Sequence, residues 1–154
     1  MLSNMRLWAN VPGQWAVQTA LGGYQSINDL ICEGGRLRQQ RDLAYELINA
    51  IPGVSCVKPQ AALYMFPRLD PEIYPIKDDQ EFFLEVLQET KVMLVQGTGF
   101  NWPHPDHFRI VFLPHEADLR EAINRLADFL ARYRLRMGTD KLLAKPAKKT
   151  KAEA

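Results

Sequence analysis

The segment from Glu116 to Arg136 carries one continuous hydrophobic repeat. Its apolar residues recur at intervals of three and four, the spacing of one face of an α-helix: Leu119, Ala122, Ile123, Leu126, Ala127, Leu130 and Tyr133. A helix with a single apolar face is stabilised mainly by burying that face against another element. The sequence therefore predicts a long last helix packed on one side of a core.

The rest of the chain alternates between helical and strand-like segments. Helical spacing occurs at 12–31, interrupted by Gly22 and Gly23, and again at 33–51 and 78–90. Runs rich in β-branched, aromatic and aliphatic residues predict strands at 54–57, 61–69, 91–96 and 107–113. We expect the first two strands to form a hairpin. The pattern predicts a two-layer α+β domain, with helices on one face of a small mixed or antiparallel sheet.

Composition indicates one ordinary globular domain. The chain has 154 residues, of which 47% are hydrophobic and 24% charged. It has no apolar run long enough to cross a membrane and no pattern of a signal peptide, so we expect a cytoplasmic protein without a membrane partner. Cys32 and Cys56 are then expected to be free thiols.

Charge separates the end of the chain from its body. Five of the 19 basic residues and two of the 18 acidic residues lie from Gly138 onward, so residues 1–137 carry 14 basic and 16 acidic groups, a net charge of −2. A slightly acidic body with a short basic end does not form the positive stripe that nucleic acids require. Residues 138–154 are predicted to be a disordered basic tail.

Two short motifs point to chemistry that the surrounding residues do not support. His104, His107 and His115 are close in sequence, but their spacing matches no metal-ligand pattern, so we expect no metal site. The Gly97–Phe100 segment follows a predicted strand, yet prolines rather than a helix follow it, which argues against a phosphate loop. We expect 97–106 to be a wide loop whose glycines adopt positive φ.

Arg109 is the candidate binding residue. It lies within Phe108–Phe112, an otherwise apolar run, where an arginine is costly unless it meets an anion. Its planar guanidinium matches a carboxylate in a two-pronged ion pair. The alternation of side chains along a strand leaves a second interpretation open, in which Arg109 points outward to water.

Five segments stand out together with the last helix: 10–23, Ile51-Pro-Gly-Val54, Ala61-Ala-Leu-Tyr-Met-Phe66, Lys91-Val-Met-Leu-Val-Gln-Gly-Thr-Gly-Phe100 and His107-Phe-Arg-Ile-Val-Phe112. They resemble the C-terminal part of class I/II aminotransferases, which are fold-type I pyridoxal-phosphate enzymes. The resemblance extends over about residues 3–133. Residues 20–26, 63–67 and 100–103 look most like the bacterial alanine (glutamate–pyruvate) aminotransferases.

The resemblance implies a role for Arg109 and an arrangement of domains. Arg109 matches the small-domain arginine that binds the α-carboxylate of the amino-acid substrate, in an enzyme that transfers an amino group to a 2-oxo acid. Residues 33–137 would form the small domain, and 1–32 would link to and pack on a large domain. The full-length enzyme is expected to be a homodimer that contains pyridoxal 5'-phosphate.

The family's Schiff-base lysine has no match in this sequence. In the family that lysine and the phosphate contacts lie in the large domain, upstream of the matched segments. Lys58, Lys77 and Lys91 fall instead at predicted turns or strand starts. Because the cofactor needs that lysine, the resemblance implies that this chain alone is inactive and contains no catalytic or cofactor-binding residue of its own.

One alternative remains open at this point. A stand-alone α+β domain could bind a small molecule for regulation, with Arg109 as its ligand contact. Trp8, Trp15 and Leu21 argue against this interpretation, because an independent domain would carry polar residues on that surface.

Overall fold

The computed structural model describes residues 10–144, which divide into two units. The first unit ends at Arg38 and the second begins at Gln39. This division lies close to the predicted boundary between residues 32 and 33.

The described part of the first unit contains two helices, α2 (Val11–Gly22) and α3 (Ile27–Ile31). The side chain of Asn10 caps α2 by accepting a hydrogen bond from the backbone N–H of Gly13. The helix ends at the predicted glycines. Gly23 is required for space, since a Cβ there would lie 2.6 Å from the carbonyl oxygen of Thr19. Neither helix has a buried residue, and Trp15 is 83% exposed.

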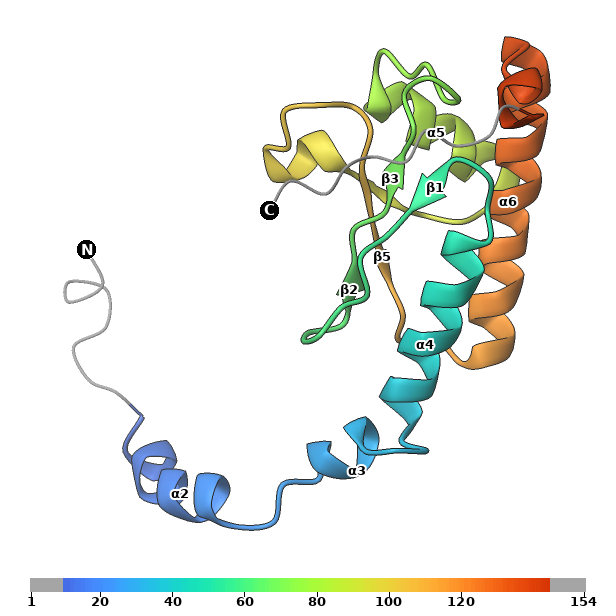
Figure 1. Ribbon diagram of the computed structural model, residues 1–154. Helices are drawn as coiled ribbons and strands as arrows, with labels where there is room; N and C mark the ends of the chain where they lie inside the picture. Colours follow the sequence, from blue (N-terminus) through green and yellow to red (C-terminus); the bar gives the residue numbers. More distant parts are fainter. Residues whose placement is uncertain (1–9, 145–154) are drawn as a thin grey trace, which may run out of the picture. The chain divides into compact units, whose positions relative to one another are not determined.

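The second unit has its helices on one side of short strands (Figure 1). The helices are α4 (Arg36–Asn49), which spans the boundary between the units, α5 (Asp79–Thr90) and α6 (Glu116–Met137). The strands are β1 (Val54–Ser55), β2 (Tyr64–Met65), β3 (Arg68–Leu69), β4 (Val95–Gln96) and β5 (Phe108–Val111). Two 3-10 helices, η1 (Gly97–Phe100) and η2 (Asp140–Ala144), complete it.

The strands form two antiparallel sheets. One pairs β1 with β3, and the other has the order β2-β5-β4, so β5 has a neighbour on each side. The predicted hairpin is correct only at its open end, where Val54 pairs with Leu69. Nearer the turn, Tyr64 pairs instead with Val111 of β5. The predicted 61–69 strand is divided into β2 and β3, which belong to different sheets.

The core lies between the helices and the sheets. The predicted stripe of the last helix is confirmed: Leu119, Ile123, Leu126, Leu130 and Tyr133 are buried on α6. They pack in one cluster with Phe82, Phe83 and Val86 of α5, Ala44 and Ile48 of α4, and Phe108, Ile110 and Phe112 from β5 and the residue after it. Asp78 caps α5 through the N–H groups of Gln80 and Glu81, as the sequence predicts.

The predicted conformation of the 97–106 loop is wrong in two respects. Residues 97–100 form η1, and neither Gly97 nor Gly99 has a positive φ. In this region Asn101 has the positive φ, 59°, and it is the residue at which η1 ends. Gly97 is required for space instead, since a Cβ there would lie 2.8 Å from the carbonyl oxygen of His107.

The predicted disordered tail also needs correction at its start. Thr139 donates a hydrogen bond from its hydroxyl to the carbonyl of Ile73 (2.7 Å), and Asp140 accepts one from Nε of Arg134 (3.2 Å). These contacts hold the beginning of the segment against Ile73 and Arg134, and η2 follows at Asp140–Ala144. Residues 145–154 of the predicted tail lie outside the described residues.

Both cysteines are free thiols, as predicted. Between residues 10 and 144, no helix combines the length and the apolar character needed to cross a membrane.

Candidate functional site

Strand β5 separates a buried face from an outer face. Phe108 and Ile110 point into the core, whereas Arg109 is half-buried and Val111 is exposed on the opposite side. The alternation of a strand therefore places Arg109 on the face away from the helices. Figure 1 shows η1 on that side of the strands.

Two aromatic rings flank the Arg109 guanidinium. Its Cζ lies 4.8 Å from the centre of the Tyr64 ring and 4.2 Å from the centre of the Phe100 ring. Tyr64 belongs to β2 and Phe100 to η1, which follows β4, so the two rings come from opposite neighbours of β5. Arginine in contact with aromatic rings keeps the N–H groups at its edge free to donate hydrogen bonds.

The guanidinium has no acid beside it in the described residues. Six other arginines form ion pairs there: Arg41, Arg68, Arg125, Arg132, Arg134 and Arg136. Nε of Arg109 is buried and has no hydrogen-bond partner within residues 10–144. Leaving a buried donor unpaired costs about 1–3 kcal/mol. An arginine held this way is suited to a carboxylate supplied from outside this part of the chain.

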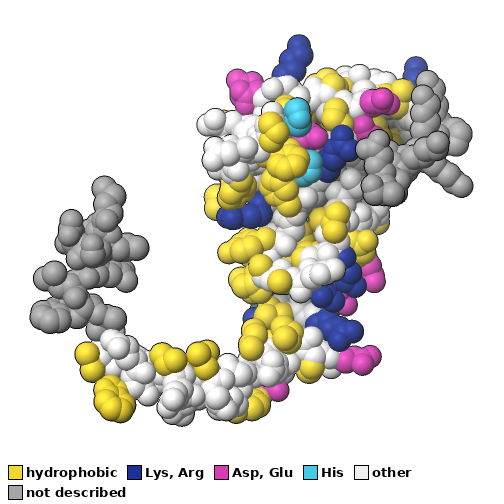
Figure 2. Space-filling model, turned by 60° about the vertical axis from the view of Figure 1, so that its left-hand side comes forward, with side chains coloured by type: hydrophobic (Ala, Val, Ile, Leu, Met, Phe, Trp, Pro, Cys, Tyr) yellow, Lys and Arg dark blue, Asp and Glu magenta, His cyan; other side chains and the backbone are white. Residues whose placement is uncertain are grey.

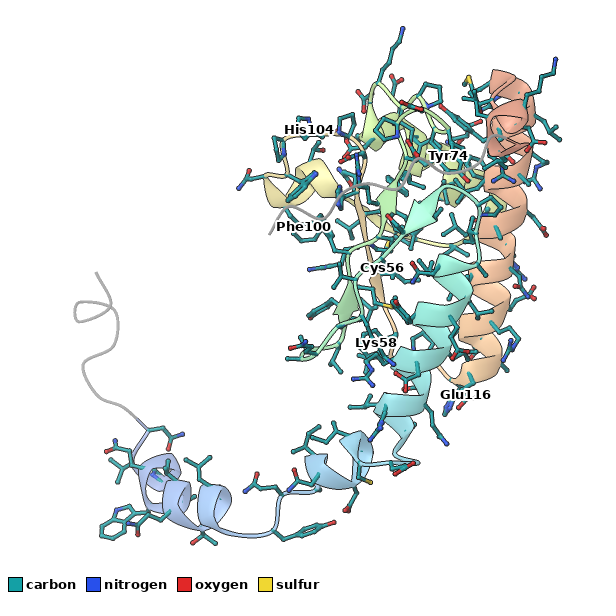
Figure 3. The ribbon with its side chains drawn as sticks, viewed as in Figure 1. Cys56, Lys58, Tyr74, Phe100, His104 and Glu116 are labelled. Carbon is teal, nitrogen blue, oxygen red and sulfur yellow. The ribbon has the colours of Figure 1, made fainter. Side chains whose placement is uncertain are left out.

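The turn that carries Phe100 is attached to helix α5. Asp79, at the first position of α5, is 3% exposed. Its carboxylate accepts hydrogen bonds from the backbone N–H of Thr98 (3.0 Å) and from the Thr98 hydroxyl (2.7 Å). The N–H of Gly97 donates to the carbonyl of His107 at 2.8 Å, which holds the same turn close to β5. Figure 3 shows Phe100 on this turn.

A second polar cluster follows η1 and is centred on the carboxylate of Asp106. It accepts hydrogen bonds from Nε1 of Trp102 (3.0 Å) and Nε of Arg68 (3.1 Å), and Nδ1 of His107 lies 2.7 Å away. Burial alone would raise the pKa of Asp106. The bonds from His107, Trp102 and Arg68 and the charge of His107 nevertheless hold its pKa below the ordinary value.

Aromatic contacts connect this cluster with the Arg109 site. The His107 ring stacks on Phe66 with 5.0 Å between centroids and contacts Trp102 at 4.4 Å. Phe66 also meets Phe100 edge-to-face at 6.3 Å. Figure 2 shows hydrophobic side chains grouped with cationic and histidine side chains on one face of the second unit.

The three histidines do not converge. His107 binds Asp106, His104 is exposed on the loop after η1, and His115 is exposed just before α6. Within the described residues no group of three or more His, Cys, Asp or Glu side chains could hold a metal ion.

The lysines of the described residues do not form a site for an aldehyde cofactor. Lys58 makes an ion pair with Asp42 at 2.9 Å, and Lys91 donates to the carbonyl of Gln88. Both are exposed, as are Lys77 and Lys141. A lysine that forms a Schiff base is normally desolvated to lower its pKa. These residues therefore do not fit pyridoxal phosphate.

Sequence reasoning identified Arg109 but missed the residues that hold it. Tyr64, Phe100 and Asp79 carry no chemical motif. The available signals were weak: a tyrosine in a predicted strand and a second aspartate after a predicted helix cap. Neither signal reveals its partner, which lies 19 residues along the chain from Asp79 and 45 from Tyr64.

The chain matches the family model for aminotransferase class I and II over residues 2–126. It is 60% identical over 133 residues to the glutamate-pyruvate aminotransferase AlaA of Escherichia coli, which covers 86% of this chain and 33% of that protein. It is also 60% identical over 134 residues to the alanine aminotransferase of Mycobacterium tuberculosis, with 87% of this chain and 31% of that protein covered. The chain thus spans about a third of the length of these curated relatives.

Solved structures agree with these matches. An aminotransferase from Escherichia coli superposes with a TM-score of 0.79 at 60% identity, covering 87% of this chain and 33% of that one. An alanine aminotransferase from Pyrococcus furiosus gives a TM-score of 0.70 at 37% identity, covering 85% and 32%. The predicted α+β part of a fold-type I enzyme is therefore confirmed, and the chain belongs to the class I and II aminotransferase family.

Proposed function

We propose that this chain supplies the α-carboxylate-binding arginine of a pyridoxal-phosphate-dependent aminotransferase. The supporting observation is the Arg109 guanidinium, which is flanked by Tyr64 and Phe100 and has a buried Nε without a partner in the described residues. A carboxylate would accept two parallel hydrogen bonds from its edge. Such a clamp orients the bonds at the substrate's Cα, which decides which of them breaks.

The proposed reaction is the transfer of an amino group between an L-amino acid and a 2-oxo acid. The relatives named above are alanine and glutamate-pyruvate aminotransferases, which supports alanine and glutamate as the amino acids. The cofactor, homodimer formation and a cytoplasmic location belong to the same proposal. The chain alone is proposed to be inactive, because the lysines within residues 10–144 do not fit the cofactor.

The exposed first unit supports this proposal over an independent binding domain. Val11, Trp15 and Leu21 of α2 are 57%, 83% and 76% exposed. Apolar surface of this kind is typical of segments that pack on another part of a protein. Trp8, the other residue that the sequence singles out here, lies outside the described residues.

A chimaera tests the proposed role of Arg109. The matching third of the Escherichia coli AlaA enzyme would be replaced by the 133 matching residues of this chain, and alanine–2-oxoglutarate transamination would be measured. We expect an active chimaera whose kcat/KM falls on the order of 100-fold for Arg109→Ala, with a smaller fall for Arg109→Lys. Arg120→Ala, on the exposed side of α6, is the matched control.

Two results would contradict the proposal. An Arg109→Ala chimaera with unchanged kcat/KM would remove the assigned role of the arginine. Pyruvate formation from alanine and 2-oxoglutarate by the isolated chain with pyridoxal phosphate would show that the chain needs no other segment.

A further inference from the structure

Phe100 can flank Arg109 only if η1 is held in one position. This 3-10 helix has four residues and exposes Thr98, Gly99 and Phe100. A helix this short does not hold its own position, because it makes few internal hydrogen bonds. Contacts from outside the turn must therefore fix it.

Asp79 provides those contacts from a different element. It is buried at the first position of α5, and both of its carboxylate oxygens bind Thr98. One bond is to the backbone N–H and the other to the hydroxyl, so both the backbone and the side chain of Thr98 are held. Thr98 lies two residues before Phe100, within the same turn.

The neighbouring acid makes no such contact. Asp78 is exposed and caps α5 through the N–H groups of Gln80 and Glu81. Adjacent aspartates thus have separate roles: Asp78 completes the helix, and Asp79 connects the helix to η1. A buried carboxylate that serves only as a connection is costly, which indicates that the position of η1 matters.

Resting on the function proposed above, we propose that Asp79 is a positioning residue for the carboxylate site. Asp79 holds η1 in place through its bonds to Thr98. The Phe100 ring on η1 then keeps the Arg109 guanidinium in the orientation in which it can bind a carboxylate. Asp79 is not expected to touch the substrate.

The side-chain NMR signals of Arg109 test this directly in the whole 154-residue chain. A proton near the face of an aromatic ring is shifted upfield, so the Hδ and Hε signals of Arg109 report on the stacking of Phe100. We expect Asp79→Ala to move these signals toward their ordinary positions, in the same direction as Phe100→Ala. The double variant Asp79→Ala/Phe100→Ala should shift the Arg109 signals no further than Phe100→Ala alone does.

Three variants separate positioning from a general loss of stability. Asp78→Ala removes the cap of the same helix and should leave the Arg109 signals unchanged. Thr98→Ser keeps both bonds and should behave as wild type. Thr98→Val removes only the hydroxyl bond and should give an intermediate shift. Because Thr98 is exposed, that variant decides the matter if Asp79→Ala does not fold.

The outcomes distinguish this inference from the proposed function. Unchanged Arg109 signals in both Asp79→Ala and Thr98→Val would overturn the positioning role. A separate titration with sodium pyruvate tests carboxylate binding, and we expect Asp79→Ala to weaken it about fivefold while Asp78→Ala does not. If pyruvate leaves wild-type Arg109 signals unmoved, carboxylate binding by this chain fails, yet the shifts without ligand still decide the role of Asp79.

Discussion

The guanidinium carbon of Arg109 lies 4.2 Å from the centre of the Phe100 ring, and its buried Nε makes no hydrogen bond within residues 10–144. Arg134 is the opposite case. It is 6% exposed and donates to the Tyr74 hydroxyl (2.7 Å) and to Asp140 (3.2 Å). One arginine therefore has a free donor, and the other is part of the internal structure.

Replacing each arginine by methionine should separate these roles. Arg134→Met is expected to lower the free energy of unfolding by about 2 kcal/mol, because charged hydrogen bonds at a buried position are lost. Arg109→Met should change it by less than about 1 kcal/mol, the scale of its contacts with two aromatic rings. Urea denaturation of the two variants measures both values. An equal loss for both would mean that Arg109 also supports the fold.

The Tyr74 hydroxyl connects Arg134 to the backbone. It donates to the carbonyl of Pro52 at 2.6 Å and accepts from Arg134, and burial raises its pKa despite the adjacent arginine. Tyr74→Phe removes the hydroxyl that bonds the Pro52 carbonyl and the Arg134 guanidinium. It should lower the free energy of unfolding by about 1–3 kcal/mol. Tyr133→Phe, in the same aromatic group, is the control and should cost less than about 0.5 kcal/mol. Thermal unfolding of the two variants would show the difference, and similar midpoints would refute it.

Asp106 should make stability depend on pH in the acid range. Its folded pKa lies below the ordinary value of 3.8, so the stabilising effect of its ionised form is complete well above that value. The effect is lost as the pH falls through the folded pKa, where the carboxyl takes up a proton. We expect Asp106→Asn to be less stable than wild type at pH 7 and the difference to shrink toward pH 3.

Urea unfolding at a series of pH values measures this difference. Glu46→Gln, which replaces an exposed acid on α4, is the control. Its free energy of unfolding should change with pH as that of wild type does. A difference between Asp106→Asn and wild type that stays constant down to pH 3 would show that the Asp106 carboxylate contributes through its shape rather than its charge.

The two thiols should react at different rates. Cys32 is exposed, whereas Cys56 is half-buried, and burial raises its pKa above the ordinary value of 9.0. Because the thiolate is the reacting species, alkylation by iodoacetamide at pH 8 should show a fast phase and a slow phase. Cys32→Ser should remove the fast phase. Loss of the slow phase in that variant would reverse the assignment.

The sequence by itself determined the helices and singled out Arg109 as the candidate binding residue. The stripe on α6, the cap at Asp78 and the break at Gly22 and Gly23 are local features, set by spacing and by the geometry of a few residues. The aromatic strand with one arginine indicated an anion site, and the resemblance of the surrounding segments to aminotransferases indicated which anion. These inferences require only neighbours along the chain.

Only the tertiary structure decided how the strands pair and how Arg109 is held. The 61–69 strand divides between two sheets because Tyr64 and Leu69 find different partners, 47 and 15 residues away along the chain. Asp79 reaches Thr98, and Tyr64 reaches Arg109, across similar separations. Such contacts depend on the packing of whole elements, and no local propensity encodes them. The candidate residue was therefore predictable from one strand, while the geometry around it is set by three elements that meet only in the fold.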